Sequence, residues 1–158
     1  TDIEDSAQMR AVLATNLDGV VNTIQPAMPL MTARGAGQIA LMSSLAGFRG
    51  LPGAPGYCSS KAAVRALGES LRVDLAGRGV GLTVICPGFV ESRITAQNPF
   101  HMPLMMSADR AAHRIARGLA RDRARITFPR RLGLAVWLLA ALPAGLGDRI
   151  LRRAPRKI

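Results

Sequence analysis

The stretch from Gly37 to Ala63 constrains the fold of this chain more than any other part of its sequence. It opens with a short apolar run, Ile39 to Met42, which predicts a strand buried on both faces of a parallel sheet. Two serines end that run, a loop rich in glycine and proline follows, and a helix is expected to begin near Tyr57. Because ligands bind outside the carboxyl ends of strands in open α/β sheets, this loop would hold Ser44 and Tyr57 over such a site.

Tyr57 and Lys61 are the two residues that indicate a candidate acid/base site. They are four residues apart, so on a helix both side chains lie on one face. A phenol with its ordinary pKa of about 10 exchanges protons poorly near neutral pH. An ammonium one turn away favours the phenolate, so we expect Lys61 to lower the pKa of Tyr57 enough for general acid/base chemistry, with Ser44 as hydrogen-bond partner. The alternative is a helix start with a buried, hydrogen-bonded tyrosine and a lysine that extends its charge to the surface.

The segment Tyr57-Cys58-Ser59-Ser60-Lys61 resembles the Tyr-x-x-x-Lys motif of the short-chain dehydrogenase/reductase family, with Ser59 where alanine is usual. Ser44 precedes Tyr57 at the separation typical of the family's catalytic serine. Asn16, within Thr15-Asn16-Leu17-Asp18-Gly19, resembles the family's fourth catalytic residue, an asparagine that holds a helix distortion and a water linking the lysine to solvent. The resemblance thus implies four catalytic residues: Asn16, Ser44, Tyr57 and Lys61. Without it, Asn16 is interpreted as a core asparagine whose amide bonds a neighbouring turn.

Pro87 and Gly88 follow a second predicted strand, Val80 to Cys86. In the family, a Pro-Gly pair at this strand end, an apolar residue and a threonine wrap the nicotinamide half of the cofactor, and here a serine replaces the threonine. The resemblance implies NAD or NADP, without a choice between them, and a set of cofactor contacts: Tyr57, Lys61, Pro87, Gly88, Val90 and Ser92. The irregular stretch from Arg93 to Pro103 corresponds to the family's mobile lid over the substrate. Taken alone, the Pro-Gly pair is an ordinary turn.

Helices are expected between these strands. Asp5 to Gln8 offers an N-cap before an apolar stripe that runs from Met9 to Ile24, and two prolines are expected to end or bend that helix: Pro26 and Pro29. The helix that carries Tyr57 should reach about Gly77. Ser107 should cap a helix through about Arg121, with four residues facing inward: Ala112, Ile115, Ala116 and Leu119. A third short strand is expected over Arg125 to Phe128.

This alternation predicts an α/β fold, namely the C-terminal portion of a Rossmann-like, doubly wound parallel sheet. No glycine-rich phosphate loop follows a first strand in these residues, so we expect two to three further βα units, roughly 80 residues, before Thr1. Residues 1–128 are expected to be the C-terminal part of a single Rossmann-type catalytic domain. Residues 129–158 are expected to be an apolar helix and a basic tail of that same domain.

The formal net charge of +11 raises the question of nucleic-acid binding. Against it, the arginines are spread over several predicted helices, and aromatic residues, on which bases would stack, make up only 4% of the chain. The two cysteines lack metal-ligand spacing and are expected to be reduced thiols of a cytoplasmic protein without a metal site. We therefore expect no nucleic-acid partner.

The segment from Leu132 to Gly147 contains no charged residue. It is shorter than the roughly 20 residues that span a bilayer, and Pro143 interrupts it. Trp137 and a cationic rim fit an interfacial segment on anionic lipid at the inner face of the membrane, the rim being Arg149, Arg152, Arg153, Arg156 and Lys157. The alternative, which the sequence favours, is a helix that buries Trp137 against the sheet or a second subunit.

The family resemblance implies a homo-oligomeric, NAD(P)-dependent oxidoreductase that interconverts an alcohol and a ketone or aldehyde by hydride transfer, with Tyr57 as general acid/base. The alternative is a catalytically silent fragment or scaffold that acts in association or membrane-surface attachment.

Overall fold

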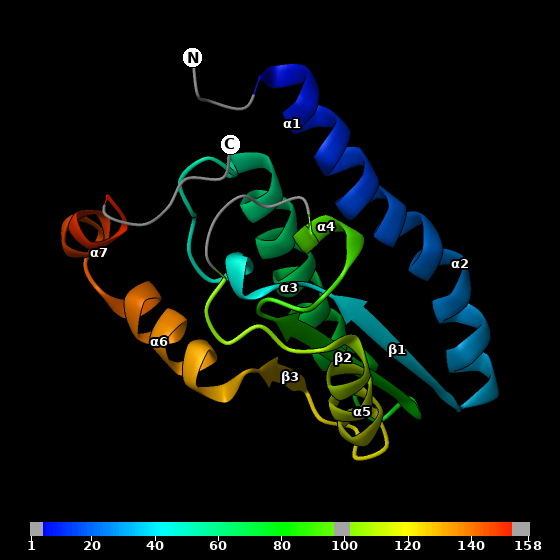
Figure 1. Cartoon of the computed structure of the whole chain (residues 1–158). Coiled ribbons are helices and arrows are strands. Elements are labelled where there is room, and N and C mark those ends of the chain that lie inside the picture. The colour runs from blue at the N-terminus through cyan, green and yellow to red at the C-terminus, as the bar shows by residue number, and fades with distance from the viewer. Residues whose placement is uncertain (1–4, 97–101, 153–158) are drawn as a thin grey trace.

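In the part of the chain that the structure describes, three parallel strands form one sheet (Figure 1). The computed structural model describes residues 5–96 and 102–152. The strands are β1 (Gly37–Met42), β2 (Val80–Pro87) and β3 (Arg125–Phe128), in the order β1-β2-β3. Ile39 pairs with Leu82, and Ile85 pairs with Ile126. The parallel sheet predicted from the sequence is confirmed.

Helices connect and follow the strands (Figure 1). Before β1 come α1 (Ser6–Leu13), a π-helical segment η1 (Ala14–Asp18) and α2 (Gly19–Arg34). The later elements are a 3-10 turn η2 (Leu45–Gly47), α3 (Pro55–Leu75), α4 (Arg93–Ala96), α5 (Ala108–Leu119), α6 (Arg130–Ala141) and α7 (Ala144–Leu151). The predicted N-cap is present, because Asp5 Oδ1 accepts hydrogen bonds from the backbone N–H groups of Ala7 and Gln8, each at 2.8 Å.

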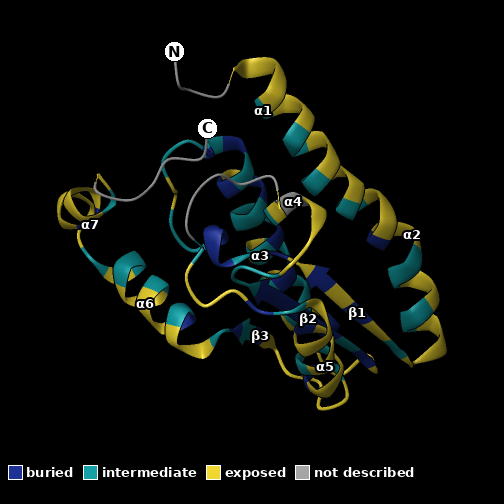
Figure 2. Ribbon diagram, in the orientation of Figure 1, coloured by how far each residue is buried: buried dark blue, intermediate teal, exposed yellow. Residues whose placement is uncertain are grey.

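The core lies on both faces of β2 (Figure 2). Leu82 and Val84 belong to the larger core cluster, against which α3 packs, whereas Ile85 belongs to a second cluster with residues of α5. Gly68 lets α3 approach the sheet closely, because a Cβ there would lie 2.5 Å from Val84 Cγ2. The doubly wound arrangement expected from the sequence is therefore present around β2.

For β1, burial on both faces was expected, and this is wrong. Ile39 and Leu41 are buried on the side that α3 covers, but Ala40 is exposed and Met42 is 46% exposed. The reason is that α5 packs mainly on β2 and β3 and meets β1 at its own C-terminal end, where Gln38 Nε2 donates to the carbonyl oxygen of Leu119 at 2.7 Å. The described residues therefore leave Ala40 and Met42 uncovered on that face.

Pro26 and Pro29 were expected to end or bend the first helix, and they do not end it. Helix α2 continues to Arg34 and ends at Gly35, whose φ of 65° is left-handed. Both prolines are exposed, so water can solvate the carbonyl groups that lose their helical hydrogen bonds. Met28 and Met31 pack against the core from the same helix, and this burial offsets the lost bonds.

Helix α5 faces the sheet with a different set of residues from the predicted one. Ala111 and Gly118 are buried, and Ile115 and Leu119 pack against the second core cluster. The other two predicted positions, Ala112 and Ala116, are exposed, and they lie at the margin of the packed face.

Pro143 separates α6 from α7, as expected. Leu132 and Val136 pack against the larger core cluster, but Trp137 is 53% exposed. The expectation that Trp137 is buried against the sheet is therefore wrong, since it lies on the side of α6 that faces away from the core, and its burial against a second subunit stays a prediction. In the described parts of the chain, no helix is both long enough and apolar enough to cross a bilayer.

Candidate active site

The carboxyl ends of β1 and β2 bring together the residues singled out in the sequence. Ser44 is the second residue after β1, has extended backbone geometry and caps the turn η2, with Oγ accepting a hydrogen bond from Ala46 N at 3.1 Å. Its hydroxyl lies 3.4 Å from the carbonyl oxygen of Pro87, the last residue of β2. Tyr57 stands in the first turn of α3 and forms a side-chain hydrogen bond with Ser44. The sheet edge therefore places the Ser44 hydroxyl and the Tyr57 phenol in contact.

Burial raises the pKa of Tyr57 above its ordinary value of 10.0. The hydrogen bond with Ser44 lowers that pKa in part, and the neighbouring Cys58 raises it. The net shift is upward, which corrects the expectation that Lys61 lowers the pKa of Tyr57. The physical reason is that the cost of charging a half-buried phenol exceeds the effect of the surrounding groups. At neutral pH, Tyr57 is a protonated phenol and so a hydrogen-bond donor.

Lys61 lies one turn after Tyr57 and extends to the same strand end. Its Nζ donates a hydrogen bond to the carbonyl oxygen of Met42 at 3.1 Å and lies 5.7 Å from the centroid of the Tyr57 ring. Burial lowers the pKa of this ammonium. The structure therefore places Lys61 beside Tyr57, with its charge directed at the backbone of β1.

Asn16 lies in η1, where the helix widens to a π-helical turn. Its Nδ2 donates to the hydroxyl of Ser60 at 3.1 Å, and that hydroxyl donates to the carbonyl oxygen of Tyr57 at 2.8 Å. The helix distortion implied by the resemblance is thus present. Asn16 is hydrogen-bonded to the first two turns of α3, which carry Tyr57 and Lys61. This also agrees with the plainer interpretation of an asparagine bonded to a neighbouring turn.

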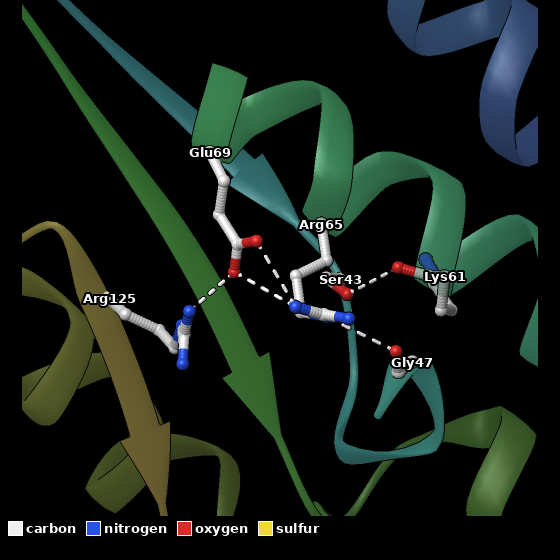
Figure 3. Close-up of polar contacts among 6 residues, drawn as sticks. All are labelled: Ser43, Gly47, Lys61, Arg65, Glu69 and Arg125. Carbon is white, nitrogen blue, oxygen red and sulfur yellow. Dashed lines mark hydrogen bonds and ion pairs between the residues drawn. The ribbon is translucent and has the colours of Figure 1, made fainter. Parts of the chain in front are cut away.

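A second layer of polar contacts, which the sequence did not reveal, fixes the turn η2 against α3 (Figure 3). The Ser43 hydroxyl donates to the carbonyl oxygen of Lys61 at 2.7 Å, and Arg65 Nε donates to the carbonyl oxygen of Gly47 at 3.2 Å. Glu69 binds Arg65 at 3.0 Å and also binds Arg125 of β3. Two neighbouring serines after a strand face opposite ways, so Ser43 could have been assigned to the α3 side from strand alternation alone. Nothing in the sequence distinguishes Gly47 from the other loop glycines.

The segment after β2 contains the other predicted cofactor contacts. Gly88 N donates to the carbonyl oxygen of Phe128 at 2.7 Å, which fixes the strand end beside β3. Val90 forms an isolated parallel bridge with Met106. Ser92 precedes α4, and its hydroxyl lies 3.1 Å from that of Thr95. Pro87 and Gly88 therefore lie at the edge of the site, while the Ser92 hydroxyl contacts Thr95 in α4. Part of the lid expected over Arg93 to Pro103, residues 97–101, is outside the described residues.

Both cysteines are buried free thiols. Burial raises the pKa of Cys86 to about 11, so that thiol is protonated and packs as a small apolar group.

A family model described as short chain dehydrogenase matches residues 1–101. The chain belongs to the short-chain dehydrogenase family. The match includes the whole constellation described above, from Asn16 to Ser92.

Relatives and solved structures place the family's fold on nearly the whole chain. An uncharacterized oxidoreductase of Myxococcus xanthus is 41% identical over 146 residues, which are 92% of this chain and 58% of that protein. A short-chain dehydrogenase from Burkholderia cenocepacia, solved in complex with NADP, shares the fold with a TM-score of 0.80 at 22% identity, over 94% of this chain and 61% of that one. A short-chain dehydrogenase from Sphingobium yanoikuyae, in complex with NADPH, gives 0.76 at 18% identity, over 96% of this chain and 59% of that one. The chain thus spans little more than half the length of these family members.

Proposed function

We propose that this protein acts in NAD(P)-dependent oxidoreduction of an alcohol and the corresponding ketone or aldehyde, with Tyr57 as the proton donor and acceptor. The observation that carries the proposal is the Tyr57 phenol, hydrogen-bonded with Ser44 at the carboxyl end of β1, with the Lys61 ammonium beside it. Family membership supports it, as do the two similar structures whose descriptions include NADP or NADPH.

The chemistry of this site depends on where its protons are. In the reductive direction, the Tyr57 phenol donates its proton to the carbonyl oxygen of the substrate, and the raised pKa keeps that proton in place at neutral pH. The Ser44 hydroxyl holds the same substrate oxygen and orients it toward Tyr57. In the oxidative direction, Tyr57 must first lose its proton, and in the ligand-free site burial opposes this loss.

The residues at the site fit the nicotinamide end of the cofactor. Lys61 and Tyr57 lie together at the strand end, next to the partly exposed start of the Pro87–Ser92 segment, and the adjacent Met42 is 46% exposed. When bound there, the cofactor supplies hydride to or accepts hydride from the substrate carbon. Lys61 would exchange its bond to Met42 O for the nicotinamide ribose, and Pro87, Gly88, Val90 and Ser92 would line the ring. Asn16 would hold a water that connects Lys61 to solvent.

We also assign residues 1–128 and 129–158 to one domain, because Leu132 and Val136 of α6 pack against the core that β1 and β2 build. A homo-oligomer and a cytoplasmic location stay predictions.

Substitution of Tyr57 by phenylalanine in the full-length gene product tests this function. Tyr57→Phe keeps the ring and removes the proton, so turnover of carbonyl substrates, followed by oxidation of NADPH and of NADH, should fall by about 10²–10⁴-fold. Cofactor binding, followed by quenching of protein fluorescence, should be largely kept. Ser59→Ala, an exposed change two residues further along the same helix, is the matched control. Wild-type turnover in Tyr57→Phe refutes the mechanism, and a full-length protein that binds neither nucleotide favours the silent scaffold.

A further inference from the structure

An open cleft lies between α5, β3 and the start of α6, at the edge of the sheet formed by β3. Its volume is about 350 Å³, and six of its ten lining residues are arginines: Arg114, Arg117, Arg121, Arg123, Arg125 and Arg130. Figure 1 shows the three elements side by side, and both helices contact β3. We call this the arginine cleft.

The charge of the arginine cleft is not neutralised by the described residues. Only Arg125 has a carboxylate partner, Glu69, whereas the other five cleft arginines form no ion pair within residues 5–96 and 102–152. Residues 102–152 contain ten arginines and three aspartates, and two of the aspartates are paired with arginines outside that range: Asp122 with Arg72 and Asp148 with Arg49. Five guanidinium groups gathered around one cleft repel each other, so binding of an anionic partner there is electrostatically favoured.

The outer face of α6 continues from this cleft. Arg130 lines the cleft and is the first residue of α6, and Leu134 and Leu138 follow it on the same helix face at intervals of four. Leu134, Trp137 and Leu138 are 59%, 53% and 52% exposed, respectively. The inner face of α6 is already occupied by the core, through Leu132 and Val136. The exposed apolar face therefore has no partner in the described chain.

Helix α7 repeats the same combination of apolar and basic side chains. Leu146 and Ile150 are four residues apart, and they are 50% and 53% exposed. Exposed arginines flank them, namely Arg149 and Arg152, and the one acidic residue of the helix, Asp148, is held by Arg49 at 2.7 Å. Two short amphipathic helices with basic flanks, divided by Pro143, are suited to lie on a bilayer and not to cross it. The remaining basic residues of the tail, Arg153, Arg156 and Lys157, are outside the described residues.

We propose that the arginine cleft and the outer faces of α6 and α7 form a docking surface for an anionic phospholipid bilayer. The cleft arginines bind lipid phosphates, while Leu134, Trp137 and Leu138 enter the interface. Charge complementarity selects this partner over a second copy of the chain, which would bring two sets of unpaired arginines together. The single aromatic residue of the cleft, Phe128, is buried and offers no base-stacking surface, which disfavours RNA or single-stranded DNA.

Vesicle binding by the full-length protein tests this surface. At low salt the protein should co-sediment with vesicles of phosphatidylglycerol and phosphatidylcholine, and not with phosphatidylcholine alone. Binding should weaken as salt rises. The fluorescence of Trp137 should shift to the blue on binding, and Trp137→Phe should remove that shift.

Two matched pairs of variants assign the two parts of the surface. Arg117→Gln with Arg121→Gln should weaken binding by about fivefold per charge, or roughly 25-fold together. The control pair Arg10→Gln with Arg78→Gln removes the same charge from exposed positions of α1 and of the turn after α3, and should change binding little. Leu134→Ser with Leu138→Ser should reduce binding at least about tenfold without lowering the melting temperature, because both side chains are already exposed.

Three outcomes overturn the proposal. The first is a folded protein that does not bind anionic vesicles at low salt. The second is equal loss in the cleft pair and the control pair, which would show a general effect of net charge. The third is binding to tRNA or heparin as tight as to vesicles with no shift of Trp137, which would assign the arginine cleft to a soluble polyanion.

Discussion

Among changes as small as one added methyl group, we expect Gly47→Ala to disturb the candidate site most. Gly47 ends the turn η2, which begins one residue after Ser44. A Cβ at this position would lie 2.7 Å from the carbonyl oxygen of Lys61 and 2.8 Å from its carbonyl carbon (Figure 3). The added methyl group would thus meet the backbone of α3, at the residue whose side chain stands beside Tyr57.

The size of the effect follows from these distances. Ordinary contacts between such atoms begin near 3.4 Å, so the turn and the helix must separate by about 0.7 Å. The helix cannot yield easily, because the same Lys61 carbonyl accepts a hydrogen bond from buried Ser43. The turn must therefore move and carry the Ser44 hydroxyl away from Tyr57. Overpacking of this kind costs about 1–3 kcal/mol of unfolding free energy, and a displacement approaching 1 Å can reduce turnover by about 10²-fold.

The assay compares Gly47→Ala with Gly50→Ala in the full-length gene product. Gly50 lies in the same loop, and a Cβ there would meet nothing within 4 Å. We expect Gly47→Ala to lower the melting temperature by about 2–4 °C per kcal/mol lost and to lower kcat more than cofactor affinity, while Gly50→Ala stays near wild type. Equal melting temperature and kcat in the two variants would refute the conclusion that close packing of η2 on α3 positions Ser44.

The remaining predictions concern the proton donor and its neighbours. The difference in tyrosinate absorbance between wild type and Tyr57→Phe should titrate above pH 10 in the folded protein and near pH 10 in denaturant, because folding raises the pKa of Tyr57. The contribution of the protonated phenol to stability is present below pH 10 and is lost as the pH rises through the folded pKa. A folded midpoint below 10 would contradict this prediction. Lys61→Met should leave that ligand-free midpoint unchanged but weaken NAD(P) binding about 10–100-fold by calorimetry, and a large shift of the midpoint would show that Lys61 controls the pKa of Tyr57 after all. Asn16→Ala removes the bond to Ser60 and should cost about 0.5–1.5 kcal/mol in urea unfolding, whereas unchanged stability would show that the bond contributes nothing.

The sheet and the positions of Ser44, Tyr57 and Lys61 could be predicted because they depend on local patterns. Short apolar runs mark strands, and the four-residue spacing of Tyr57 and Lys61 fixes their common helix face. The direction of the Tyr57 pKa shift could not be predicted in this way. It depends on how deeply the loop between Ser44 and Pro55 buries the phenol, and burial is a property of the packed structure.

Tertiary packing also explains the predictions that failed elsewhere. Local propensity ends a helix at Pro26 or Pro29, but the core contacts of Met28 and Met31 lie beyond the first proline and hold the helix together. The apolar run of Leu132 to Gly147 looks equally buried along its length in the sequence. Only the register of α6 against β3 shows that Leu132 and Val136 face the core while Trp137 faces away.

The first two turns of α3 connect the parts of the candidate site. Within them, the Tyr57 phenol bonds Ser44, and the Ser60 hydroxyl accepts a hydrogen bond from Asn16. The Lys61 ammonium contacts Met42 of β1, and the Lys61 carbonyl group accepts from Ser43. Met42 ends β1, Ser43 and Ser44 directly follow it, and Asn16 comes from η1, so two segments converge on five residues of one helix. A change at any of these contacts therefore displaces the proton donor relative to its partners. This is why we expect the methyl group at Gly47 to lower kcat, although the change removes no group that would touch the substrate.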